Sequence, residues 1–135
     1  MYETVLTLIG ARLQDNWDEV AIPVAWDGVE YEPVRGQSFI RLVVTQTESV
    51  LTTAASPGKG NYREHGLITV QVFTEWTQGA VVNANVADMV TDLFRGYTVD
   101  RLFCQEARIN RIGQREEWYQ ANVLIDFYYD NCLNA

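Results

Sequence analysis

The sequence contains few of the residues that form disulfides, bind metals or carry out catalysis. Its 135 residues include one histidine, His65, and two cysteines, Cys104 and Cys132. Two isolated cysteines do not form a disulfide framework, and a metal site requires more ligands at closer spacing. We therefore interpret both cysteines as reduced thiols in a cytosolic protein, and we expect no metal and no cofactor.

A recognisable catalytic constellation is also missing. A serine-type triad would require a nucleophile close to His65. Neither Ser49 nor Ser56 lies in the sharp strand-to-helix turn that is typical of such nucleophiles. The string Gly58-Lys59-Gly60 lacks the Ser or Thr after the lysine, and the following helix, that a phosphate-binding loop needs. Glu116 and Glu117 are neighbours on a predicted strand, where adjacent side chains point to opposite faces and do not form an acid–base pair. The sequence thus predicts a protein that is not an enzyme.

Long apolar runs and a basic leader are absent as well. No apolar run reaches about 18 residues, the length that a transmembrane helix needs, so no contact with a membrane is expected. Met1–Gly10 contains no basic residue, which argues against a signal peptide. The net charge of −8 argues against a partner bound through its phosphates. Met1–Val34 holds seven of the 18 acidic residues and one of the ten basic ones, so we expect one negative surface there.

The residues that are present predict one α+β domain spanning residues 1–135. Hydrophobic residues make up 47% of the chain, which is enough for an ordinary core. Apolar residues at helical spacing predict helices over Tyr2–Trp17 and Ala80–Arg95, and prolines make Ala21–Val34 an extended segment. Strands are predicted at Ser38–Glu48, Leu67–Trp76, Val99–Ile112 and Glu116–Asp130, with a turn at Gly113–Arg115. The expected fold is a mostly antiparallel four-stranded sheet packed by two helices.

A long loop is predicted between the first two main strands. The stretch Thr52–Arg63 has Pro, Gly and Lys near its centre, whereas hairpin loops usually contain about 2–5 residues. Such a loop is either disordered slack or an arm that becomes ordered against a partner, and we favour the arm because no catalytic site competes with it. Trp118 and Tyr128 have apolar rings with polar tips, which favours a place at a subunit boundary. If the last strand, Tyr119–Tyr129, lies at a sheet edge, it would pair with a neighbouring subunit.

The order of features along nearly the whole chain resembles that of the tail terminator proteins of long-tailed bacteriophages and prophages. A short amphipathic helix comes first, and a closing strand comes last. The strings between them that carry the resemblance are Ile22-Pro23-Val24-Ala25-Trp26-Asp27-Gly28-Val29, Tyr31-Glu32-Pro33, Phe39-Ile40-Arg41-Leu42, Arg63-Glu64-His65-Gly66 before Leu67-Ile68-Thr69-Val70-Gln71-Val72-Phe73, Asp92-Leu93-Phe94-Arg95-Gly96 and Trp118-Tyr119.

The resemblance implies a structural role without chemistry. Proteins of this kind cap the growing tail tube as a ring, stop its polymerisation and offer a surface for head joining. The implied partners are other copies of the chain, in a homohexamer, the tail tube protein and a head-completion or neck protein. The implied location is the head-proximal end of the tail in the virion, and the host cytoplasm during assembly. DNA would pass through the lumen without specific binding, which a negative lining favours.

The long loop would then be the arm that contacts the tube. The residues predicted for this contact are Pro57, Gly58, Lys59, Tyr62 and Arg63, while Trp118 and Tyr128 are predicted at subunit boundaries. Two other classes of function stay open at the level of sequence. One is a different head–tail connector or neck protein, and the other is a small ligand-binding protein, which would require a pocket with convergent titratable groups.

Overall fold

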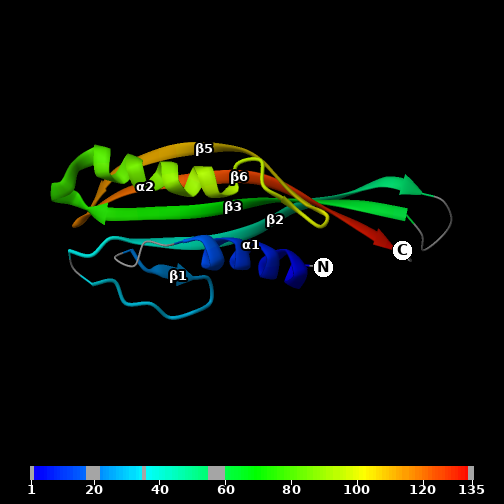
Figure 1. Ribbon diagram of the computed structural model, residues 1–135, viewed down its shortest axis with the longest axis horizontal. Helices are drawn as coiled ribbons and strands as arrows, with labels where there is room; N and C mark the ends of the chain where they lie inside the picture. Colours follow the sequence, from blue (N-terminus) through cyan, green and yellow to red (C-terminus); the bar gives the residue numbers. More distant parts are fainter. Residues whose placement is uncertain (1, 18–21, 35, 55–59, 134–135) are drawn as a thin grey trace.

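The computed structural model describes residues 2–17, 22–34, 36–54 and 60–133 (Figure 1). They form two helices, one short 3-10 turn and six strands. The elements are α1 (Tyr2–Asn16), β1 (Val24–Trp26), β2 (Phe39–Ala54), β3 (Gly60–Glu75), η1 (Trp76–Gln78), α2 (Gly79–Phe94), β4 (Thr98–Val99), β5 (Leu102–Arg115) and β6 (Trp118–Leu133). Neither described helix is long and apolar enough to cross a membrane.

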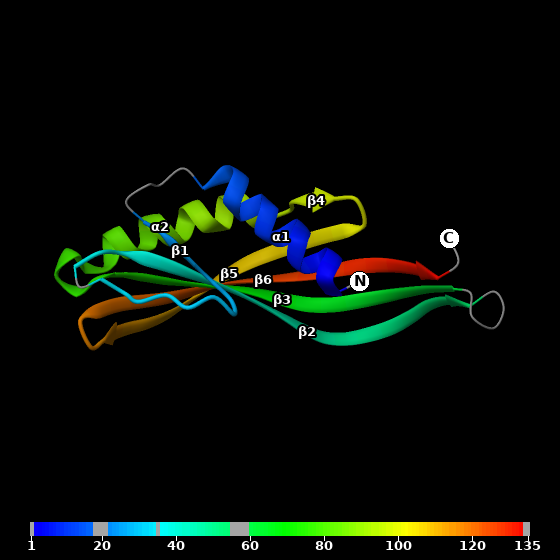
Figure 2. The ribbon, with the colours of Figure 1, turned by 90° about the horizontal axis from the view of Figure 1, so that it is seen from below.

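All six strands belong to one sheet with the order β1-β2-β3-β6-β5-β4. Only β1 pairs in parallel, with Val24 opposite Ile40, and the other neighbours are antiparallel. Figure 2 shows the sheet curling, with α1 and α2 lying on the same face. The prediction of a four-stranded sheet was therefore wrong, although the α+β class and the two helices were right. The two added strands, β1 and β4, are three and two residues long, which is too short for a periodic signal in the sequence.

The predicted long loop is mostly strand, and that prediction was also wrong. β2 and β3 continue toward each other until Ala54 pairs with Gly60, so only residues 55–59 remain between them. Small and polar residues made this stretch resemble a loop. The backbone hydrogen bonds of an antiparallel ladder, however, do not require apolar side chains. β6 joins the same ladder, with Leu133 opposite Gly60. Figure 1 shows these three strand ends extending beyond the helices, and we call residues 48–54, 60–64 and 129–133 the arm.

The main core lies between the helices and the inner face of the sheet. α1 buries Val5, Ile9 and Leu13, as its helical spacing predicted. α2 buries a similar stripe that ends at Phe94, which is fully buried. Burying each such side chain contributes about 1.5–3 kcal/mol. The sheet contributes alternate residues to this core, namely Ile40, Leu42, Val44, Ile68, Val70, Val72, Val123, Ile125 and Phe127.

At the end of the sheet opposite the arm, the turn between β5 and β6 lies a few residues later than predicted. The turn between β5 and β6 lies at Glu116 and Glu117, with Glu116 at φ 57°, and not at residues 113–115. Gly113 instead lies beside a register shift within the β5–β6 ladder, with φ 96°. A glycine with positive φ is common at both turns and bulges, which explains the error. β6 is flanked by β3 and β5, so the last predicted strand, Tyr119–Tyr129, does not lie at an edge of the sheet.

Candidate assembly surfaces

A cluster of ionic and aromatic side chains lies where the arm meets the body of the protein. Arg63 on β3 forms a two-pronged ion pair with Asp130 on β6, with Nε–Oδ1 at 2.9 Å and Nη2–Oδ2 at 3.2 Å. The guanidinium carbon also lies 4.2 Å from the centre of the Tyr128 ring. Phe103 of β5 stacks on Tyr128 with ring centres 4.8 Å apart, and the His65 ring centre is 6.2 Å away. We call these five residues the Arg63 cluster.

The electrostatics of the Arg63 cluster follow from the ion pair. The hydrogen bond from Arg63 lowers the pKa of Asp130, and the hydrogen bond to Asp130 raises the pKa of Arg63. The Arg63 side chain is 37% exposed and that of Asp130 is 21% exposed. The pair is therefore an accessible charged surface, and its rigid fork and stacked ring give it a fixed shape.

The structure brings together only some of the predicted interface residues. Arg63 and Tyr128 are in contact, while Tyr62 points to the other face of β3 because adjacent strand residues alternate. Trp118 lies at the opposite end of β6, is 9% exposed and packs edge-on against Phe39 at 5.3 Å. Pro57, Gly58 and Lys59 lie outside the described residues. An interface role for these seven residues stays a prediction.

The partners of Arg63 were not found from the sequence. Asp130 and Phe103 are separated from Arg63 by many residues, and only the register of β3 with β6 and of β6 with β5 brings them into contact. The available signal was the pair of carboxylates, Asp126 and Asp130, in a strand otherwise rich in aromatic and apolar residues, and the sequence does not show which of them meets Arg63.

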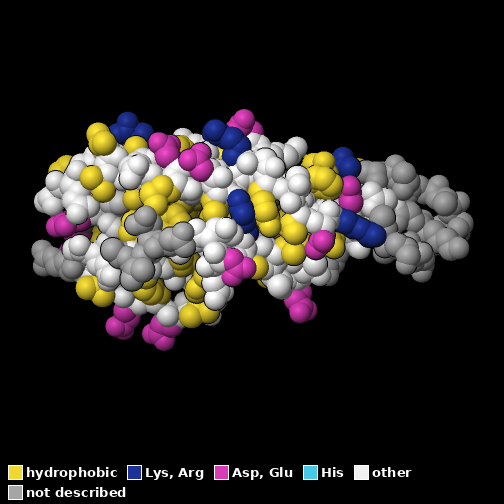
Figure 3. Space-filling view, viewed as in Figure 1, with side chains coloured by type: hydrophobic (Ala, Val, Ile, Leu, Met, Phe, Trp, Pro, Cys, Tyr) yellow, Lys and Arg dark blue, Asp and Glu magenta, His cyan; other side chains and the backbone are white. Residues whose placement is uncertain are grey.

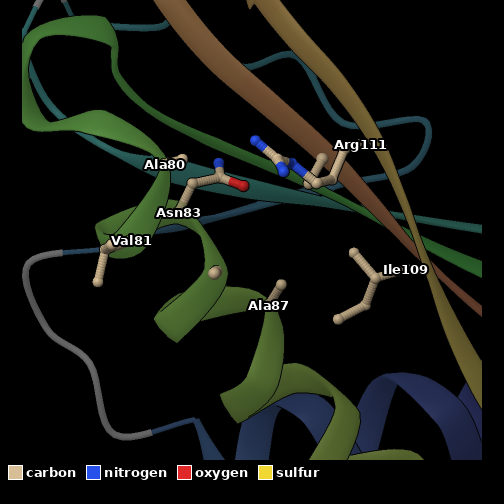
Figure 4. Close-up of a pocket in the computed structure, with 8 residues that line it drawn as sticks. Ala80, Val81, Asn83, Ala87, Ile109 and Arg111 are labelled. Carbon is tan, nitrogen blue, oxygen red and sulfur yellow. The ribbon is translucent and has the colours of Figure 1, made fainter.

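A groove lies on the helix face of the sheet, between the first turns of α2 and β5 (Figure 4). Its cavity volume is about 460 Å³. The α2 side is built from small residues, so the helix does not fill the space above β5. Figure 4 shows Ile109 and Arg111 of β5 facing this side of α2. The lining residues are Ala80, Val81, Asn83, Ala84, Ala87, Ile109, Arg111 and Ala121.

Asn83 fixes the position of α2 against the sheet. It is 2% exposed, and its Nδ2 donates to the Thr74 hydroxyl at 3.1 Å and to the Tyr119 carbonyl at 2.9 Å. Arg111, at the opposite wall of the groove, donates to the Tyr119 hydroxyl. The groove thus has a firm polar anchor on one side and an exposed cation on the other.

At both edges of the sheet, part of the outer strand backbone has no neighbouring strand within the described part of the chain. β4 pairs only with Leu102 and Phe103 of β5, and the chain before β4 contacts the β5 backbone as far as Gln105. On the other side, β1 pairs with β2 only at residues 40–42. The outer backbone edges of residues 106–115 and 43–54 therefore have no strand neighbour among the described residues. Open edges of this length are sites for pairing with another chain.

The described residues hold no group of three or more His, Cys, Asp or Glu side chains arranged to bind a metal. His65 belongs to the Arg63 cluster. Cys104 is buried in the core, and burial raises the pKa of its thiol to about 11. A thiol with such a pKa is protonated at neutral pH and is a poor nucleophile.

Two solved structures and one family model are similar to this chain. No curated protein matches the sequence. One solved structure, of a protein without a functional description, superposes with a TM-score of 0.64 at 17% identity, covering 91% of this chain and 94% of the other. Another, from the virion of a native gene transfer agent (GTA) particle, superposes with a TM-score of 0.55 at 14% identity, covering 94% and 95%. At these low sequence identities, the two similarities show a shared fold and nothing more. The family model described as phage tail terminator protein matches residues 4–127, and the chain therefore belongs to the phage tail terminator family.

Proposed function

We propose that the protein caps the head-proximal end of the phage tail tube as a ring of six copies, ends tube polymerisation and provides the surface for head joining. Membership of the tail terminator family over residues 4–127 is the observation that carries this proposal. The family makes the chain a structural protein of the phage tail and virion. Its partners would be further copies of itself, the tail tube protein and a head-completion or neck protein, met in the host cytoplasm during assembly.

The charge of the chain supports a ring through which DNA passes. The net charge is −8, with 18 acidic residues against ten basic ones. A surface with this sign repels phosphates, so DNA would cross the lumen without being held.

The arm is the proposed contact with the tube. Three long strands reach beyond the helices there, and the Arg63 cluster provides a rigid, accessible surface at its base. Tyr62, Arg63 and Tyr128, together with residues 57–59, are the proposed contact residues. Arg63→Ala should impair capping, whereas Arg95→Ala, which breaks the exposed Arg95–Glu106 pair away from the arm, should not. Normal capping after removal of residues 56–61 would argue against the arm as the contact.

Tail length after deletion of the gene from its parent phage tests the proposed function. Negative-stain microscopy should show overlong tubes without heads, and the intact gene supplied in trans should restore normal length. Tails of normal length that fail to join heads would favour a different neck protein. Intact infectious particles would contradict both structural functions.

A further inference from the structure

We propose that the groove between α2 and β5 binds residues 27–34 of the next copy of this chain, which makes it one half of a head-to-tail subunit contact. This inference rests on the proposed ring, and it names the surfaces that would join its subunits. Three observations support a second copy as the occupant: the positions of the two surfaces, their charges and their exposed apolar side chains.

The two surfaces lie on opposite sides of the molecule. The sheet order places β1 at one edge and β5 near the other. Figure 1 shows α2 and β5 along one long side, and the segment that follows β1 along the other. A ring needs a contact of this kind, in which one patch meets a different patch on the neighbour, because identical patches facing each other close as a dimer.

The β5 wall of the groove and residues 27–34 carry charges of opposite sign. β5 carries three arginines against one acidic residue, Glu106, which is paired with Arg95. Arg108 is paired with Asp126, while Arg111 and Arg115 are exposed and form no ion pair with another described residue. Two cations on this strand are therefore available to a partner.

Residues 27–34 carry the matching charge, with three acidic side chains, Asp27, Glu30 and Glu32, and no basic one. These three are also in no ion pair within the described part of the chain, and all are exposed. Figure 3 shows acidic side chains along the lower edge of the molecule, where this segment runs, and both basic and acidic side chains at the upper edge. Complementary patches of this kind steer association and fix its register.

Both surfaces also expose apolar side chains to solvent. Val81 at the groove is 82% exposed and Ile109 is 42% exposed, while Val29 and Val34 on the other side are 63% and 56% exposed. Seating the two valines in the groove would remove apolar surface on both copies from water, which favours association. The charges at the rim would then select the orientation.

Site-specific cross-linking in assembled tails tests the contact directly. A chain with Val29→Cys and Ile109→Cys, in a Cys132→Ser background, would be assembled in the parent phage and treated with a short bis-maleimide. The expected product is a ladder of linked copies that ends at the closed ring. The matched control replaces Ile109→Cys with Val50→Cys, because Val50 is also 42% exposed but lies on the arm. Equal yields from the two pairs, or links to the tube protein instead of a second copy, would overturn the proposal.

Charge reversal provides a second test with tail length as its readout. Arg111→Glu with Arg115→Glu should abolish termination and give overlong tails. Adding Glu30→Arg with Glu32→Arg to the same chain should restore normal length, because every interface in the ring then carries the reversed pair. Arg95→Ala, which breaks the exposed Arg95–Glu106 pair and lies outside the groove lining and the arm, is the control and should leave the length unchanged.

The outcomes separate this inference from the proposed function. If the gene deletion leaves tail length normal, the proposed function fails. If the deletion gives overlong tails but the reversal of Arg111 and Arg115 leaves a folded protein with normal tails, the inference alone fails. The melting temperature of each purified variant reports whether it folds, and the cross-linking test uses neither charge change.

Discussion

Among the glycines for which the structure describes the surroundings, Gly66 is the one that tolerates a side chain least. It lies in β3 directly opposite Phe127, and a Cβ added there would lie 2.3 Å from Cζ of the Phe127 ring and 2.7 Å from the Thr45 carbonyl oxygen. Phe127 is only 3% exposed, so its ring has little room to move away. Gly66→Ala should therefore displace either the ring or the β2 backbone.

The size of the effect follows from two opposing terms. Overpacking a buried site costs about 1–3 kcal/mol. Replacing a glycine by alanine lowers the conformational entropy of the unfolded chain, which stabilises the folded state by about 0.4–1 kcal/mol. We expect a net loss of about 1–2 kcal/mol, which for a domain of this size lowers Tm by roughly 3–8 °C. Thermal unfolding followed by circular dichroism would measure the change.

A matched substitution should have the opposite sign. Gly10 lies within α1, and a Cβ there would meet only the Trp26 ring, at 3.9 Å. Gly10→Ala should raise stability by up to about 1 kcal/mol, because alanine favours the helix. In the Gly66→Ala protein, Phe127→Leu should cost less than it does in the wild type, since the smaller side chain relieves the clash. A Gly66→Ala protein as stable as the wild type would refute the reasoning.

Three further substitutions or treatments test other parts of the structure. Asn83→Ala leaves the buried Thr74 hydroxyl without its partner, and it should cost about 1–3 kcal/mol in urea unfolding; an unchanged midpoint would contradict its role as an anchor. The pKa of Asp130 is lowered in the folded state, so the stability that it contributes is present above its unfolded pKa of about 3.9 and is lost as the pH falls through the lower folded value. The Tm difference between the wild type and Asp130→Asn should accordingly be constant above about pH 5 and shrink in more acidic buffer, and a difference that grows there would be inconsistent with the pair to Arg63. Cys104, with a pKa of about 11, should react with iodoacetamide in the native protein far more slowly than in urea, with Cys104→Ser as the blank.

The helices could be predicted from the sequence because their signal is local. Tyr2–Trp17 was predicted and α1 is Tyr2–Asn16, while Ala80–Arg95 was predicted and α2 is Gly79–Phe94. A stripe of apolar residues at helical spacing depends on no other part of the chain except a surface to pack on. The same holds for the central parts of β2, β3 and β6.

The arm could not be predicted because its strands are held by partners distant in sequence. Residues 60–63 pair with residues 130–133 of β6, and their composition is that of a loop. The groove escaped prediction for a related reason. From the sequence, the alanines of α2 indicate only that the segment is helical. Their small side chains form one wall of a groove only because β5 lies opposite them in the fold. Trp118 was predicted at a subunit boundary from its chemistry, and its burial against Phe39 depends on a strand far away in the chain.

The distribution of charge over the sheet decides what kind of symmetry the proposed contact allows. Two β5 edges facing each other would bring Arg111 and Arg115 against their own copies, and two acidic segments would repel in the same way. Each copy therefore carries two surfaces that disfavour themselves and favour each other. Such a pair favours a continuing head-to-tail series over a two-fold dimer, and the angle between the two surfaces sets whether the series closes. A cap on a tube needs this behaviour, because a closed ring leaves neither surface free to recruit further copies, while the arms, which take no part in the proposed contact, stay available to the tube.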